Sequence, residues 1–229
     1  MSGLLHFSEH SLQEFALGFM ALVYIIRLVW LIHFKAGRDR QAQTGAANTN
    51  PRKGFIYSWA NIAMPWAMES TRTKFFLYVQ FAIFHLGVTA AIGLSFVIPY
   101  APGLLESAAL VIILKTIIGA AFIVGVMRFV RRLSNKYMRA ISSPDDYFSL
   151  TLLTAWFFFA YLSVPNSTES GEWHLLGYFI LTAFFLVYVP FSKISHYLYY
   201  PFTRYYLGKT MGHRGVYPMR HVPQPREQR

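Results

Sequence analysis

The chain of 229 residues contains no cysteine, and only 14% of its residues are charged. The absence of cysteine excludes disulfides, thiolate-bound zinc and cysteine-ligated iron–sulfur clusters within the chain. An ordinary soluble domain has roughly a quarter of its residues charged and needs a polar exterior to cover its apolar interior. The low charge, together with 55% hydrophobic residues in long blocks, therefore indicates a membrane protein.

Five stretches are long enough to cross a bilayer, which takes about 20 apolar residues in a helix. We predict spans at about 15–34, 75–98, 104–127, 147–164 and 174–197. The expected fold is an all-α integral membrane five-helix bundle, with residues 1–207 as the membrane domain and 208–229 as a cytoplasmic tail. Residues 1–14 lack the basic residues of a signal peptide, so we expect the first stretch to be a retained span.

Basic residues gather in alternate loops. Residues 1–14, 99–106 and 165–173 contain glutamates but no Lys or Arg. Of the 21 Lys and Arg, all but Arg27 and Lys115 lie in or beside the loops after the first and third stretches or in the C-terminal part, which makes 19. The positive-inside rule therefore predicts a multi-pass protein of the cytoplasmic membrane, with its N-terminus outside and its C-terminus inside. Topology and contact with anionic lipids explain the net charge of +11 without nucleic-acid binding.

Two histidines are the strongest candidates for a cofactor site. His85 lies within the second stretch and His196 near the inner end of the fifth, so the opposite directions of these helices place both in the inner half of the membrane. Two neutral imidazoles facing each other across a helix bundle are the usual axial ligands of a b-type haem. The alternative for each buried histidine is a hydrogen bond across the bundle. Glycines on neighbouring helices would let a flat ring approach the backbone: Gly87, Gly93, Gly119 and Gly125.

Basic side chains near the predicted haem are candidates for its carboxylates. Arg128, Arg131 and Arg132 follow the third stretch at its inner end, where they could pair with haem propionates or serve as ordinary positive flanks. Arg27, near the inner end of the first stretch, could bind a quinone carbonyl or pair with a propionate. Lys115 lies halfway along the third stretch, where a lysine must be paired or neutral, and it is a candidate to bind a quinone or a propionate.

Three segments carry a family resemblance: Phe84-His85-Leu86-Gly87, RRLSNKYMRAISSPDDYFSLTLL at 131–153 and PFSKISHYLYYP at 190–201. With them the chain resembles the membrane cytochromes b of the respiratory nitrate reductase gamma subunit family, whose relatives occur in heterodisulfide reductase, sulfite-reduction and hydrogenase-linked complexes. The resemblance runs from about 62 to 207. It implies two haem positions, of which the first matches His85 and His196. The second falls on Ser95 and Tyr178, so the resemblance implies one haem b.

His174 leaves a second haem open. It lies one helical turn before Tyr178 and would bind an outer haem together with His6 or His10, giving a diheme cytochrome. Otherwise it is an interfacial residue or a proton-handling group at a quinone site, because an imidazole titrates near neutral pH.

These residues predict an electron-transfer subunit of a quinone-linked oxidoreductase complex, with quinone as substrate close to the haem. A chain without cysteine needs an iron–sulfur partner on the cytoplasmic face, and the resemblance implies a subunit of heterodisulfide-reductase or ferredoxin type. The alternative from another class is a haem-free membrane scaffold or transporter subunit, in which His85 and His196 are structural.

Overall fold

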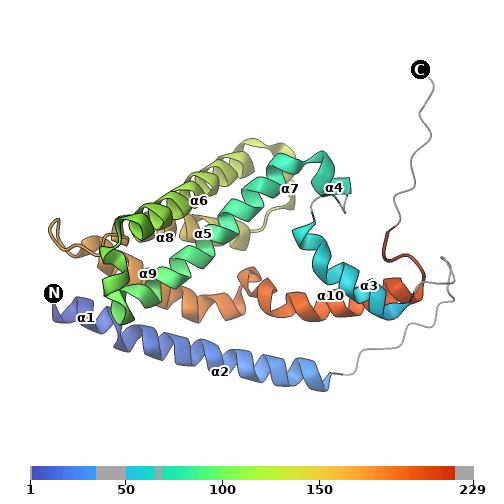
Figure 1. Cartoon of the computed structure of the whole chain (residues 1–229), viewed down its shortest axis with the longest axis horizontal. Coiled ribbons are helices and arrows are strands. Elements are labelled where there is room, and N and C mark those ends of the chain that lie inside the picture. The colour runs from blue at the N-terminus through green and yellow to red at the C-terminus, as the bar shows by residue number, and fades with distance from the viewer. Residues whose placement is uncertain (1, 35–49, 65, 67–68, 220–229) are drawn as a thin grey trace. The chain divides into compact units, whose positions relative to one another are not determined.

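The computed structural model describes residues 2–34, 50–64, 66 and 69–219, and within them every regular element is a helix. The all-α class is therefore confirmed for these residues. The chain divides into two compact units, one made of Met1–Phe34 and Val79–Ser195, the other of Lys35–Tyr78 and His196–Arg229. Figure 1 labels the helices of both units.

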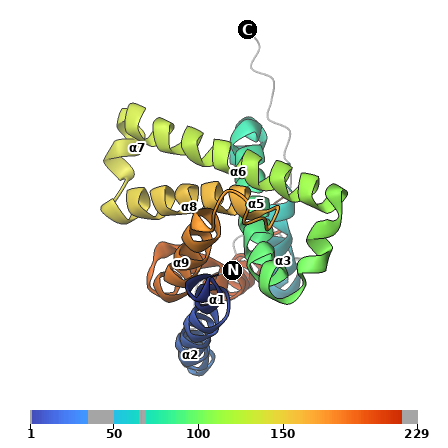
Figure 2. The same ribbon diagram turned by 90° about the vertical axis from the view of Figure 1, so that its left-hand side faces the viewer.

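The first unit holds the long apolar helices. They are α1 (Gly3–Glu9), α2 (Ser11–His33), most of α5 (Phe75–Tyr100), α6 (Ala108–Ser134), α7 (Lys136–Ile141), α8 (Pro144–Ser163) and α9 (Trp173–Tyr188). α8 packs against both α6 and α9, and α2 packs along α9 (Figure 2). Buried side chains of α5, α6, α8 and α9 form the core of this unit, among them Phe84, Leu94, Ile118, Phe157 and Phe179.

Four segments of the described chain are long and apolar enough to cross a membrane: Gly3–His33, Phe75–Tyr100, Ala108–Ser134 and Trp173–Phe191. The predicted span 147–164 lies in α8, a helix of 20 residues. Because α8 begins with Pro144, Asp145 and Asp146, its apolar run is shorter than those of the other four. Crossing by α8, and with it the five-helix membrane bundle, stays a prediction at this point.

The third apolar helix is shifted along the chain from the predicted 104–127. Residues 102–106 form a separate 3₁₀ turn, η2 (Pro102–Glu106), and α6 begins after Ser107. The Ser107 hydroxyl accepts the backbone N–H of Leu110, the N-cap bond that starts a helix. α6 then continues to Ser134.

The predicted span 174–197 is not one helix. α9 ends at Tyr188, and two 3₁₀ turns, η3 (Val189–Phe191) and η4 (Lys193–Ser195), precede α10 (His196–His213). Pro190 accounts for the break, because proline has no backbone N–H to continue the hydrogen bonds of the helix. His196 is consequently the first residue of a new helix rather than part of the last turn of a span.

The second unit consists of α3 (Pro51–Ala60), η1 (Asn61–Ala63), α4 (Glu69–Thr73) and α10. α3 packs along α10 in the opposite direction. Near one end Gly54 lies against Gly212, and near the other the Trp59 indole donates to the Pro201 carbonyl at 3.0 Å. α10 continues through Gly208 to His213, so the helix extends beyond the predicted boundary at 207. Residues 220–229 of the predicted tail lie outside the described residues.

Candidate functional site

His85 lies near the middle of α5, half-buried among apolar side chains. Its Nδ1 is 2.8 Å from the carbonyl oxygen of Phe81. A carbonyl only accepts, so Nδ1 carries the proton, and in the neutral ring Nε2 carries the lone pair. A hydrogen bond of this kind orients the imidazoles that ligate metals. His85 therefore fits an axial ligand of haem iron.

Arg128 lies beside the residue that precedes His85. Its guanidinium is 5.2 Å from the ring centroid of Phe84, which is buried. No acidic side chain in the described part of the chain forms an ion pair with Arg128. A half-buried guanidinium with this environment fits a carboxylate partner such as a haem propionate. Arg131, one turn from Arg128, is exposed.

Asp146, in the first turn of α8, forms ion pairs with two basic side chains. Its Oδ2 lies 3.1 Å from Lys193 Nζ and 3.8 Å from Arg132 Nη1. The same oxygen accepts the backbone N–H and the hydroxyl of Ser143, each at 2.8 Å. These hydrogen bonds, those of Ser143 first, lower the pKa of Asp146 to about 2. Of the three arginines predicted for propionates, Arg132 thus already has a carboxylate partner.

His196 is exposed at the start of α10, with its ring 6.5 Å from that of Tyr197. His196 belongs to the second unit, whereas His85 belongs to the first. Ligation of one haem by both histidines stays a prediction.

The two basic residues within predicted spans have protein partners. Lys115 Nζ lies 5.6 Å from the ring centroid of Tyr161 on α8, a cation–π contact. Arg27 donates to the carbonyl oxygen of Pro190, and its guanidinium lies 5.3 Å from the Phe191 ring. Arg27 thereby satisfies a carbonyl just after α9, where helix ends leave such groups without partners. Roles for Lys115 and Arg27 toward quinone or propionate stay predictions.

The positions that the resemblance gives to a second haem pair are in direct contact. Tyr178 is fully buried, and its hydroxyl donates to the carbonyl oxygen of Ala91 on α5 at 2.5 Å. The side chain of Ser95 is within hydrogen-bonding reach of the same hydroxyl. This phenol joins α9 to α5, and neither Ser95 nor Tyr178 offers an imidazole to iron, so these two residues do not fit the ligands of an outer haem.

His174 has the opposite tautomer to His85. The side chain is buried, and its Nδ1 accepts the backbone N–H of Leu175 at 2.8 Å. Because Nδ1 accepts, the neutral ring carries its proton on Nε2, and that nitrogen has no lone pair for iron. In this state His174 fits a hydrogen-bond donor better than a haem ligand.

Two of the four glycines expected near a haem lie at helix crossings. A Cβ on Gly87 would overlap the Cβ of Ala121, and one on Gly125 would lie 2.6 Å from Thr154 Oγ1. They allow α5 to approach α6 and α6 to approach α8. A Cβ on Gly119 would lie 3.3 Å from the Tyr161 ring, closer than ordinary packing, and a Cβ on Gly93 would meet no atom within 4 Å.

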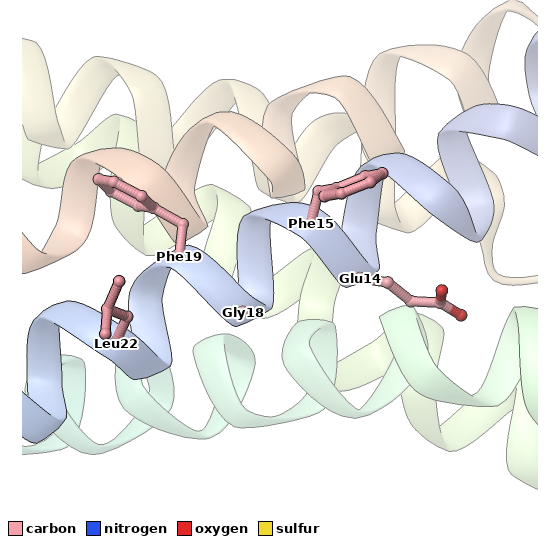
Figure 3. Close-up of a pocket in the computed structure, with 5 residues that line it drawn as sticks. All are labelled: Glu14, Phe15, Gly18, Phe19 and Leu22. Carbon is pink, nitrogen blue, oxygen red and sulfur yellow. The ribbon is translucent and has the colours of Figure 1, made fainter.

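An open groove of about 390 Å³ runs along α2 (Figure 3), lined by Glu14, Phe15, Gly18, Phe19 and Leu22. A Cβ on Gly18 would meet nothing within 4 Å, so the glycine opens the middle of the groove. At one end the Glu14 carboxylate accepts the hydroxyl of Tyr100 at 3.1 Å. Sequence reasoning missed this groove because apolar residues at helical spacing indicate only a lipid-facing surface.

No family model, curated protein or solved structure matches this chain.

Proposed function

We propose that the chain is an integral membrane cytochrome b subunit that transfers electrons between membrane quinone and an iron–sulfur protein on its cytoplasmic face, through one haem b held by His85 and His196. The observation that carries this proposal is the Nδ1 bond of His85 to Phe81 at 2.8 Å, which directs the lone pair to Nε2. A bound haem b supplies a one-electron carrier.

The protein's own residues provide orientation and charge. The carbonyl of Phe81 fixes the ring of His85, and Arg128, stacked on Phe84, offers a cation to a carboxylate on the same side of α5. Arg132 and Lys193 instead form ion pairs with Asp146. Arg128 is therefore the propionate partner that we favour among the three arginines.

Packing inside the second unit supports five membrane crossings. α3 lies in the connection from α2 to α5, and α10 follows α9, yet α3 and α10 pack closely together. The end of α9 must then lie on the same side of the membrane as the end of α2. Crossings by α2, α5, α6 and α9 alone would put these two ends on opposite sides. We therefore infer that α8 crosses as the fifth helix, which also keeps the basic loops on one side.

An iron–sulfur partner follows from the absence of cysteine, because the chain has no cluster of its own to exchange electrons with the haem. The partner type, heterodisulfide-reductase-like or ferredoxin-like, follows from the resemblance. The basic loops provide a surface of the right charge for an acidic electron carrier.

The haem content of the purified protein tests the proposal. A pyridine haemochrome assay should give about one haem b per chain, since His85 and His196 form one ligand pair. H85A and H196A should each lose it. H33A is the matched control, because His33 Nδ1 is 2.8 Å from the carbonyl of Val29 in the same local arrangement, and it should retain the haem.

The rival readings give different results in the same assay. No haem in the wild-type protein would support the scaffold or transporter, and two haems lost in part by H174A would support the diheme cytochrome. A normal haem spectrum in both H85A and H196A would refute the ligand assignment.

A further inference from the structure

The second unit presents an exposed surface built from two helices, which we name the α3–α10 face. It consists of Arg52, Ile56 and Trp59 on α3 and of Tyr205 and Lys209 on α10, all exposed. Their spacings of three or four residues place them along one side of each helix. The buried glycines that join the helices occupy a different side, and the five side chains of this face remain exposed.

Contacts between the two helices make the face continuous. Phe55 lies beside Tyr205 with ring centroids 5.5 Å apart, and the Trp59 indole binds the Pro201 carbonyl. Lys209 Nζ lies 5.7 Å from the Tyr205 ring. Because the helices are antiparallel, Arg52 and Lys209 lie toward the same end of the pair, and Trp59 lies toward the other.

The charge of this unit is predominantly positive. Residues 50–78 and 196–219 contain one acidic residue, Glu69, against these basic residues: Arg52, Lys53, Arg72, Lys74, Arg204, Lys209 and Arg214. Exposed Trp and Tyr with neighbouring Lys and Arg are the combination that lies at the headgroup level of a bilayer. Each such cation contributes about fivefold to binding of an anionic membrane surface, which corresponds to about 1 kcal/mol.

We propose that the α3–α10 face lies on the inner leaflet and binds the headgroups of anionic phospholipids. The chain connectivity supports a lipid occupant, because the second unit follows α2 and α9 and precedes α5 along the chain, which tethers it to the membrane helices of the proposed topology. The inference rests on the membrane topology of the proposed function and is independent of the haem.

Single cysteines test this face, since the natural chain has none to compete for a label. I56C and Y205C would carry a nitroxide in full-length protein in nanodiscs of phosphatidylcholine, with or without phosphatidylglycerol. T203C is the matched control, because Thr203 is exposed and lies about 200° around α10 from Tyr205. Collisions of the nitroxide with oxygen show that it lies in the bilayer, and collisions with a water-soluble nickel chelate show that it lies in water.

We expect phosphatidylglycerol to shift I56C and Y205C toward oxygen while T203C remains accessible to nickel. R52Q and K209Q, added to the labelled variants, each remove one cation. Each should lower the ratio of membrane-bound to water-exposed label by about fivefold. Nickel accessibility that is unchanged by phosphatidylglycerol would overturn the proposal. If soluble polyglutamate, and not phosphatidylglycerol, protected the labels at 56 and 205 from nickel, the proposal would also be overturned, in favour of an acidic protein partner. Haem content is measured on the same samples. A normal haem content with either of these results would refute the lipid face alone, whereas loss of haem would bear on the proposed function.

Discussion

The hydroxyl of Tyr178 donates a hydrogen bond to the backbone carbonyl of Ala91 at 2.5 Å, which joins the middle of α9 to α5. The resemblance would place one ligand of an outer haem at position 178. Since the phenol reaches across to the opposite helix, the two helices are held together where that haem would separate them. Tyr178 therefore has a structural role between α9 and α5, and one haem b stays our proposal.

Y178F should destabilise the protein without changing its haem content. Removing the buried hydroxyl deletes one hydrogen bond between helices, which costs about 1–2 kcal/mol. The thermal unfolding midpoint in detergent measures the loss. Y137F is the control, because Tyr137 is 71% exposed and the change should be neutral. A second haem in Y178F would contradict the structural role given to this tyrosine.

The sequence allowed prediction of the long helices and of the position of His85 within one of them, because both depend on local composition. Hydropathy alone locates α2, α5 and α6, and an isolated histidine in an apolar helix is visible without a structure. The partner of Arg27 was not predictable, since Pro190 approaches it only when α2 packs along α9. The break before His196 was signalled by Pro190, but the apolar residues on either side of it favoured a continuous span.

The seam between α3 and α10 was equally hidden, because Gly54 and Gly208 are far apart in the sequence and glycine is common in such proteins. G54A should destabilise the second unit. The new Cβ would lie 2.6 Å from the Cα of Gly212 and would overlap the carbonyl of Gly208, and overpacking of this kind costs about 1–3 kcal/mol.

G93A is the matched control for G54A. A Cβ on Gly93 meets no atom within 4 Å, so alanine there should be neutral or stabilise α5 by up to about 1 kcal/mol. Thermal unfolding or limited proteolysis around α3 measures the difference. Equal stability of G54A and G93A would refute the close seam.

Crossing by α8 predicts opposite accessibility at its two ends. S170C lies in the exposed segment before α9, and A140C lies in α7, also exposed. In right-side-out membrane preparations, a membrane-impermeant maleimide should label S170C at once and A140C only after the membrane is permeabilised. Labelling of both from the same side would exclude the fifth crossing.

Asp146 predicts a dependence of stability on acid. Its pKa falls from 3.8 to about 2 because Ser143 and Lys193 stabilise the carboxylate in the folded state. The stabilisation is present above about pH 4, the unfolded value, and is lost as the pH falls through about 2. D146N should flatten this part of the stability curve, whereas E106Q, at an exposed residue of η2, should leave it unchanged. Identical acid profiles for D146N and the natural protein would show that this carboxylate makes no contribution.

R128Q should weaken haem retention, whereas R131Q should leave it unchanged. R128Q removes a half-buried cation beside Phe84 and His85, and loss of one charge-assisted hydrogen bond of about 1.5 kcal/mol weakens haem retention about tenfold. R131Q removes an exposed charge on the same helix and should retain haem as the natural protein does. Transfer of haem to excess apomyoglobin measures retention, and the reduction potential should fall in R128Q, because a cation near iron favours the reduced state. Equal haem transfer from both variants would move the propionate partner away from Arg128. Unchanged unfolding midpoints in both variants would show that this difference comes from the haem site and not from stability.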